Sequence, residues 1–134
     1  WLELSWVRRA LGRLPDALTA TERALELDHG SVPALAEKGA LEEALGEHDR
    51  AAEAFRAAIS LNPDDPALWA GLGKAEFSRG HHREAAEAFG ESLHRSPDDA
   101  ALWLHLGEVL LLLDHVDDAY DAFRKSADLR PDQA

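Results

Sequence analysis

The residues of this chain that could support metal or acid–base chemistry are its histidines and its paired carboxylates. His81 and His82 are adjacent and lie close to Glu84, and zinc accepts both imidazole and carboxylate ligands. Adjacent side chains at the start of a helix point in different directions, so a metal bound here would need a further ligand from elsewhere. We therefore expect packed or solvated histidines, and we assign no metal ligand.

Neighbouring aspartates could perform acid–base chemistry, and such pairs occur at 64–65, 98–99 and 117–118. Each pair falls where a helix is expected to start, and negative charge is stabilised at that end of a helix. Capping is therefore the better interpretation. The chain has no Gly-x-Ser-x-Gly nucleophile elbow and no Walker-type phosphate loop. We assign no catalytic residue and no cofactor, and we expect the chain not to be an enzyme.

The elements that position these side chains follow from a pattern that recurs every 34 residues. One copy contains Trp69, Leu72, Gly73, Gly80, Ala85, Phe89, Leu93 and Pro97. The next copy contains Trp103, Leu106, Gly107, Asp114, Ala119, Phe123, Ala127 and Pro131, and the preceding one Leu35, Lys38, Gly39, Gly46, Ala51, Phe55, Ile59 and Pro63. A truncated copy begins at Trp1. A fixed period of this length is typical of stacked repeat architectures.

The order Trp-x-x-Leu-Gly, followed by Gly, Ala, Phe and Pro at these offsets, resembles the tetratricopeptide repeat. The resemblance covers nearly the whole chain, with departures at Ser5, Thr21, His29, Lys38 and Asp114. It implies an all-α fold of four helix-turn-helix repeats and eight helices, coiled into a right-handed superhelix. It also implies that the first helix of each repeat lies on the concave side. We expect a single array over 1–134, with repeats at 1–31, 32–65, 66–99 and 100–133.

The expected helices cover 1–12, 15–28, 32–45, 49–61, 66–79, 82–95, 100–113 and 116–129. Gly46 and Gly80 should end their helices in the left-handed conformation, which glycine adopts without steric cost. Asp114 can adopt the same conformation at some cost. The residues expected to cap helix starts are Ser31, Asp65 and Asp99.

In the family that this chain resembles, the exposed face of the first helices lines a groove that holds peptides. The side chains expected to form this groove are Leu2, Trp6, Arg9, Glu43, Lys74, Phe77, Leu104, Glu108 and Leu111. Exposed aromatic side chains flanked by charge are typical of binding anchors. Alternatively, superhelical packing half-buries Phe77 and Leu111, and Trp6 packs on an upstream unit. Some family members clamp a C-terminal carboxylate with lysine and asparagine side chains on this face, but here those places are occupied by Leu2, Trp6, Ala36 and Ala40, and none of them is asparagine.

The charge of the chain restricts its partners. Its formal net charge is -12, with no basic stripe, so a nucleic-acid partner is disfavoured. An acidic field favours the approach of a basic partner, although acidity can also serve solubility alone. No apolar run approaches the roughly 20 residues that span a bilayer. The chain has no cysteine and shows no signal peptide, so the compartment stays open, with the cytoplasm favoured.

These observations predict a protein–protein interaction module or scaffold that holds a peptide or partner helix in its groove. One alternative is the substrate-positioning segment of a larger transferase, hydrolase or oxygenase whose catalytic domain lies outside these residues. Another is a structural array that self-associates through uncapped ends, because Tyr120, Phe123 and Ala127 have no following helix to cover them.

Overall fold

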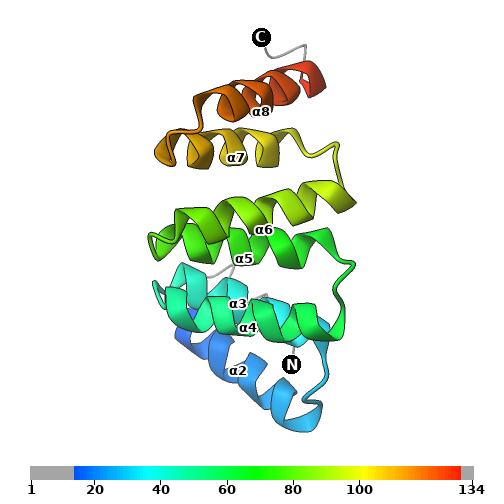
Figure 1. The fold of residues 1–134 in the computed structure, drawn as a ribbon. Helices are drawn as coiled ribbons and strands as arrows, with labels where there is room; N and C mark the ends of the chain where they lie inside the picture. Colours follow the sequence, from blue (N-terminus) through cyan, green and yellow to red (C-terminus); the bar gives the residue numbers. More distant parts are fainter. Residues whose placement is uncertain (1–13, 131–134) are drawn as a thin grey trace. The chain divides into compact units, whose positions relative to one another are not determined.

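The computed structural model describes residues 14–130. This range consists of α-helices joined by short turns and contains no strand (Figure 1). Its seven helices are α2 (Leu14–Leu27), α3 (Val32–Ala44), α4 (His48–Leu61), α5 (Pro66–Ser78), α6 (His82–Arg95), α7 (Ala100–Leu112) and α8 (Val116–Leu129). Each begins and ends within one residue of its predicted bounds. The predicted helix over 1–12 lies outside the described residues.

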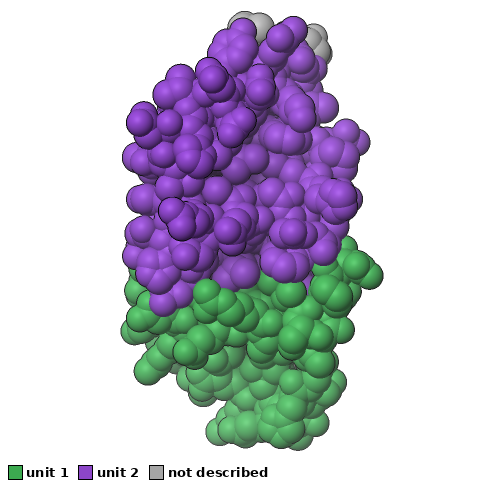
Figure 2. Space-filling model, viewed as in Figure 1, with its two compact units in different colours: residues 1–64 green, residues 65–134 purple. Residues whose placement is uncertain are grey.

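The chain divides into two compact units, residues 1–64 and residues 65–134 (Figure 2). In unit 1, α3 packs against both α2 and α4. In unit 2, α5 packs against α6 and α7 against α8, and α6 also packs against α7. The boundary falls in the turn between α4 and α5. Each unit therefore contains at least one pair of helices that are consecutive in the sequence.

The turns inside the helix pairs have the conformation that the sequence predicts. Gly46 and Gly80 have φ angles of 83° and 81°, and Asp114 has a φ angle of 64°. All three lie in the left-handed region, which glycine enters freely and aspartate enters at a steric cost. The chain reverses direction at these residues, which brings the second helix of each pair back along the first.

The three predicted caps are also confirmed. The Ser31 hydroxyl accepts a hydrogen bond of 3.2 Å from the Ala34 amide. The carboxylates of Asp65 and Asp99 each accept a bond of 3.0 Å from an amide in the first turn of the helix that follows. These bonds satisfy amides that have no partner inside the helix. They fix the starts of α3, α5 and α7, the first helices of three pairs.

In the three pairs that the structure describes completely, a glycine on the first helix faces a phenylalanine on the second. The pairs are Gly39 with Phe55, Gly73 with Phe89, and Gly107 with Phe123. A Cβ atom built on these glycines would lie 2.8, 2.5 and 2.7 Å from the facing ring. Real Cβ atoms are not found that close to a neighbouring side chain. The absence of a side chain therefore allows the aromatic ring to lie against the backbone of the partner helix.

A second contact recurs in unit 2, one repeat apart. The Ser92 hydroxyl on α6 donates a hydrogen bond of 2.8 Å to the carbonyl of Pro66. The Ser126 hydroxyl on α8 donates one of the same length to the carbonyl of Ala100. Each serine is buried, so the bond satisfies a hydroxyl that has left water. The bond also joins the end of the second helix to the start of the first.

None of the helices in the described part of the chain is both long enough and apolar enough to cross a membrane.

Candidate functional site

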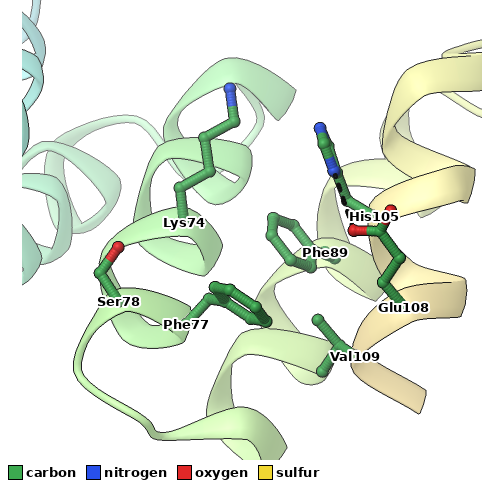
Figure 3. A pocket seen from close by; sticks show the side chains of 7 residues that line it. All are labelled: Lys74, Phe77, Ser78, Phe89, His105, Glu108 and Val109. Atoms are coloured by element: carbon green, nitrogen blue, oxygen red, sulfur yellow. Dashed lines mark ion pairs between the residues drawn. The ribbon is translucent and has the colours of Figure 1, made fainter. Parts of the chain in front are cut away.

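A pocket of about 300 Å³ opens on unit 2, between helices α5, α6 and α7 (Figure 3). The residues that line it are Lys74, Phe77 and Ser78 from α5, Phe89 from α6, and His105, Glu108 and Val109 from α7. Three of these, Lys74, Phe77 and Glu108, are among the predicted groove residues. The structure therefore brings together side chains that are up to 35 residues apart in the sequence, from Lys74 to Val109.

The inner part of the pocket is apolar. Phe89 and Val109 belong to the buried core of unit 2, and Phe89 is only 2% exposed. Phe77 is 38% exposed, and its ring lies 5.3 Å from the ring of His82, at an angle of 57°. The His82 contact supports one side of the Phe77 ring. Phe77 thus combines a supported position with the exposure that a contact residue requires.

The outer part of the pocket carries charge. Lys74 lies on the α5 side, and His105 and Glu108 lie on the α7 side (Figure 3). The His105 ring stacks on Phe89, with the ring centres 6.3 Å apart. Its Nδ1 atom lies 3.9 Å from Glu108 Oε2, which is longer than a hydrogen bond. Glu108 is more than half exposed, so its carboxylate remains accessible to a ligand.

The other predicted groove residues lie outside this pocket. Leu104 and Leu111 are exposed on α7 but do not line the pocket. Glu43 belongs to unit 1, where its Oε2 atom lies 2.9 Å from His48 Nδ1. Three further predictions fall outside the described residues, namely Leu2, Trp6 and Arg9.

The sequence analysis missed the remaining residues that line the pocket. Phe89 is a member of the recurring pattern; its ring packs against Gly73 and also lines the pocket. His105 has no acidic residue four positions further along the chain. Glu108 follows it by three, a spacing that also places two side chains on one helix face. That spacing was the signal available in the sequence.

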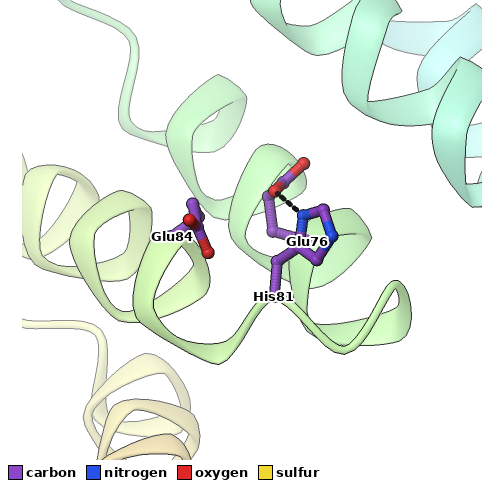
Figure 4. Close-up of side chains that lie close together, drawn as sticks. All are labelled: Glu76, His81 and Glu84. Carbon is purple, nitrogen blue, oxygen red and sulfur yellow. Dashed lines mark hydrogen bonds and ion pairs between the residues drawn. The ribbon is translucent and has the colours of Figure 1, made fainter.

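One cluster has the residue types of a metal site. In the described part of the chain, the ligand atoms of Glu76, His81 and Glu84 lie within 4.8 Å of one another (Figure 4). Glu76 is 1% exposed, and its two oxygens already have partners. Arg79 Nη1 donates to Oε1 at 2.7 Å, and His81 Nδ1 lies 3.0 Å from Oε2. A metal ion would have to compete with the arginine for this carboxylate.

The arrangement around Glu76 has a structural explanation. Arg79 and His81 flank the left-handed residue Gly80, and both reach back to the carboxylate on the last turns of α5. The buried acid therefore ties down the turn between α5 and α6, and its charge is compensated by the arginine. We assign these residues to the turn and not to a ligand.

A second buried carboxylate lies one repeat earlier, at Glu42 in unit 1. Glu42 is also 1% exposed, and Lys38 Nζ lies 3.3 Å from its Oε2 atom. Burial raises the pKa of Glu42 above its ordinary value of 4.5, and Lys38 opposes that shift. Desolvation of the charged form is the largest influence on this carboxyl.

Comparisons with known proteins place the chain in a family. Residues 32–75 and residues 70–134 match two family models, each described as a tetratricopeptide repeat. The chain belongs to the tetratricopeptide repeat family. A comparison with curated proteins found no match.

Several solved structures are similar to the chain. The crystal structure of MamA has a TM-score of 0.93 at 23% identity, over 98% of this chain and 77% of that one. MamA from Desulfovibrio magneticus has a TM-score of 0.92 at 22% identity, over 98% and 75%. A thermophilic TPR protein from Thermus thermophilus has a TM-score of 0.78 at 26% identity, over 97% and 73%. The likeness to MamA concerns the fold.

The family and fold predictions are therefore confirmed: the chain is an all-α array of helix-turn-helix repeats. Repeats of this family form modules for protein–protein interaction, and this is the class of protein to which the chain belongs. The pocket on unit 2 is the candidate binding site on this module.

Proposed function

We propose that the chain holds a segment of a partner protein against the exposed face of α5 and α7, with the pocket on unit 2 as the central contact. One observation carries this proposal. A partly exposed aromatic ring, Phe77, lies beside an apolar hollow that has charged residues at its edge. Such hollows, filled by a large side chain and surrounded by polar contacts, supply most of the binding free energy at protein interfaces.

The size of the pocket supports a single side chain as the occupant. Sites for cofactors and other small molecules measure about 300 to 1,000 Å³, and this pocket, at about 300 Å³, is at the lower limit. It is also open to solvent. A large apolar side chain on a longer segment would fill the inner part, while the rest of the segment would lie across α5 and α7.

The test is a selection of peptides from a displayed random library, with the full chain as bait and three versions compared. These are the unmodified chain, Phe77→Ala and the matched control Tyr120→Ala. Tyr120 is also an exposed aromatic residue, 64% exposed on α8, and it does not line the pocket. Fluorescence anisotropy should show that the selected peptides bind the unmodified chain and the Tyr120→Ala variant with equal affinity. Phe77→Ala should weaken this binding at least tenfold, since truncating an interface anchor costs about 2 kcal/mol. Equal binding to all three versions would move the site away from this pocket.

A second candidate function is self-association through α8. Leu112, Val116, Tyr120 and Leu129 are exposed on α8 and on the end of α7. Sedimentation velocity would detect association as a concentration-dependent increase in mass. Tyr120→Glu is a suitable variant, whereas Phe123→Glu is not, because the Phe123 ring packs against Gly107 and its loss would disrupt the helix pair. A mass that Tyr120→Glu leaves unchanged would exclude this face as the interface.

A further inference from the structure

We propose that the pocket on unit 2 selects the order of charges in the segment it binds. The bound segment places a large apolar side chain in the pocket, an aspartate or glutamate against Lys74, and a lysine or arginine against Glu108. This inference rests on the proposed function and extends it from a site to a direction of binding and a class of partner segment.

The first observation concerns the charge of Lys74 and its partners. Lys74 is the one lysine or arginine among the residues that line the pocket, and it is exposed. Two arginines of unit 2 have acidic partners within the chain, Arg79 with Glu76 and Arg95 with Glu91. Lys74 has no ion pair among the described residues, in a chain with 26 acidic and 14 basic side chains. A ligand carboxylate is the partner that its charge and position fit.

The second observation concerns the opposite edge of the pocket. Glu108 is on α7, across the apolar floor from Lys74 (Figure 3). Its neighbour His105 is 3.9 Å away, too far for a hydrogen bond that would hold the carboxylate. The Glu108 carboxylate can therefore rotate toward a basic group on a ligand. The His105 ring stacks on Phe89, and the Glu108 carboxylate stays exposed to solvent.

The two charges have opposite signs and lie on different helices, with the apolar side chains between them. A segment that crosses from α5 to α7 meets a positive charge, then the apolar pocket, then a negative charge. In one orientation its own charges attract both edges, and in the reverse orientation they repel both. Charge complementarity of this kind fixes the register and direction of a bound segment. The net charge of the whole chain affects the rate of approach of a basic partner, whereas this pair affects its orientation.

The experiment compares the peptides selected from a displayed random library by the unmodified chain and by the double variant Lys74→Glu, Glu108→Lys. The double variant keeps the net charge at -12 and exchanges only the two edges. Both residues are exposed, so the fold should be retained, and circular dichroism checks this. The unmodified chain should enrich peptides with an apolar residue between an acid and a base in one fixed order, and the double variant should enrich the reverse order.

Direct binding then measures the effect. Two peptides made from the enriched consensus, identical in composition and opposite in charge order, should differ by about tenfold in Kd for the unmodified chain, because two exposed ion pairs are replaced by two repulsive contacts. The preference should invert with the double variant.

The outcomes separate the two proposals. Enrichment of an apolar residue without a fixed charge order, or an order that the double variant leaves unchanged, would overturn the inference of charge order and leave the proposed pocket standing. Peptides whose binding does not depend on Phe77, or the recovery of no peptide above background, would overturn the proposed site and the charge order with it.

Discussion

Replacement of Gly73 by alanine tests the packing that brings α5 and α6 together. An added Cβ at Gly73 would lie 2.5 and 2.6 Å from two atoms of the Phe89 ring. Phe89 is 2% exposed, so its ring can move only by displacing its neighbours or by entering the pocket that it lines. Either the ring or one of the two helices must shift. Gly90, on α6, is the matched control, because a Cβ added there would meet nothing within 4 Å.

The two substitutions differ in one term. Alanine is favoured over glycine inside a helix by about 1 kcal/mol, so Gly90→Ala should raise the free energy of unfolding by about that amount. Gly73→Ala gains the same helix propensity but also overfills a packed contact, which costs about 1 to 3 kcal/mol. Gly73→Ala should therefore be neutral or lower the free energy of unfolding by up to about 2 kcal/mol. The difference between the two variants measures the steric cost itself.

Urea titrations monitored by far-ultraviolet circular dichroism give these free energies. Because repeat arrays need not unfold in one step, hydrogen exchange of the α5 and α6 amides provides a local check. Phe89→Leu should relieve the clash, so Gly73→Ala should cost less in a Phe89→Leu background than in the unmodified chain. If Gly73→Ala stabilised the chain as much as Gly90→Ala, the close approach of α5 and α6 would be refuted.

Two other predictions concern single residues. Asp114→Gly should raise the free energy of unfolding by up to about 1 kcal/mol, because Asp114 has a φ of 64° and glycine adopts this conformation without steric cost; a lower urea midpoint would contradict it. Burial raises the pKa of Glu42 above 4.5, so the folded state binds the Glu42 proton more tightly than the unfolded state does. The free energy of unfolding should therefore fall as the pH rises from 4.5 to the raised pKa, where Glu42 ionises in the folded state. Glu42→Gln should reduce that fall in a series of urea titrations, and identical pH slopes for the two proteins would exclude the effect.

The helices and turns could be predicted from the sequence because their signals are local. Proline, aspartate and serine mark the helix starts, and Gly80 or Asp114 marks a reversal. Backbone conformation and first-turn hydrogen bonds depend on a few neighbouring residues, so the residue types alone specify them. The fixed period adds a further constraint, because each copy confirms the interpretation of the others.

The burial of Glu42 could not be predicted in the same way. Glu42 and Glu43 are adjacent acids on an amphipathic helix, and such pairs are usually solvated. Only the packing around α3 shows that Glu42 is buried beside Lys38. The tie from Arg79 and His81 to Glu76 likewise depends on the path of the turn that the three residues close.

Only the part of the pocket that follows from the repeat pattern could be predicted from the sequence. Lys74 and Glu108 were expected on one face because they occupy the same position in successive repeats, and Phe77 follows Lys74 by three residues on the same helix. The contribution of Phe89 and His105 depends on how α6 packs against α7, a contact between two repeats. The period identifies which helix face is exposed, but the depth of a hollow depends on the sizes of side chains from three helices.

The packing contact and the proposed site share one residue, and this connects stability to binding. Phe89 packs against Gly73 and also lines the pocket. A methyl group at Gly73 that displaces the ring would change the shape of the pocket that receives the ligand side chain. Gly107→Ala crowds the Phe123 ring in the same way, but Phe123 does not line this pocket. Gly73→Ala should therefore weaken peptide binding, while Gly107→Ala should affect stability alone. Equal losses of binding in the two variants would mean that binding responds to the stability of unit 2 and not to the shape of the pocket.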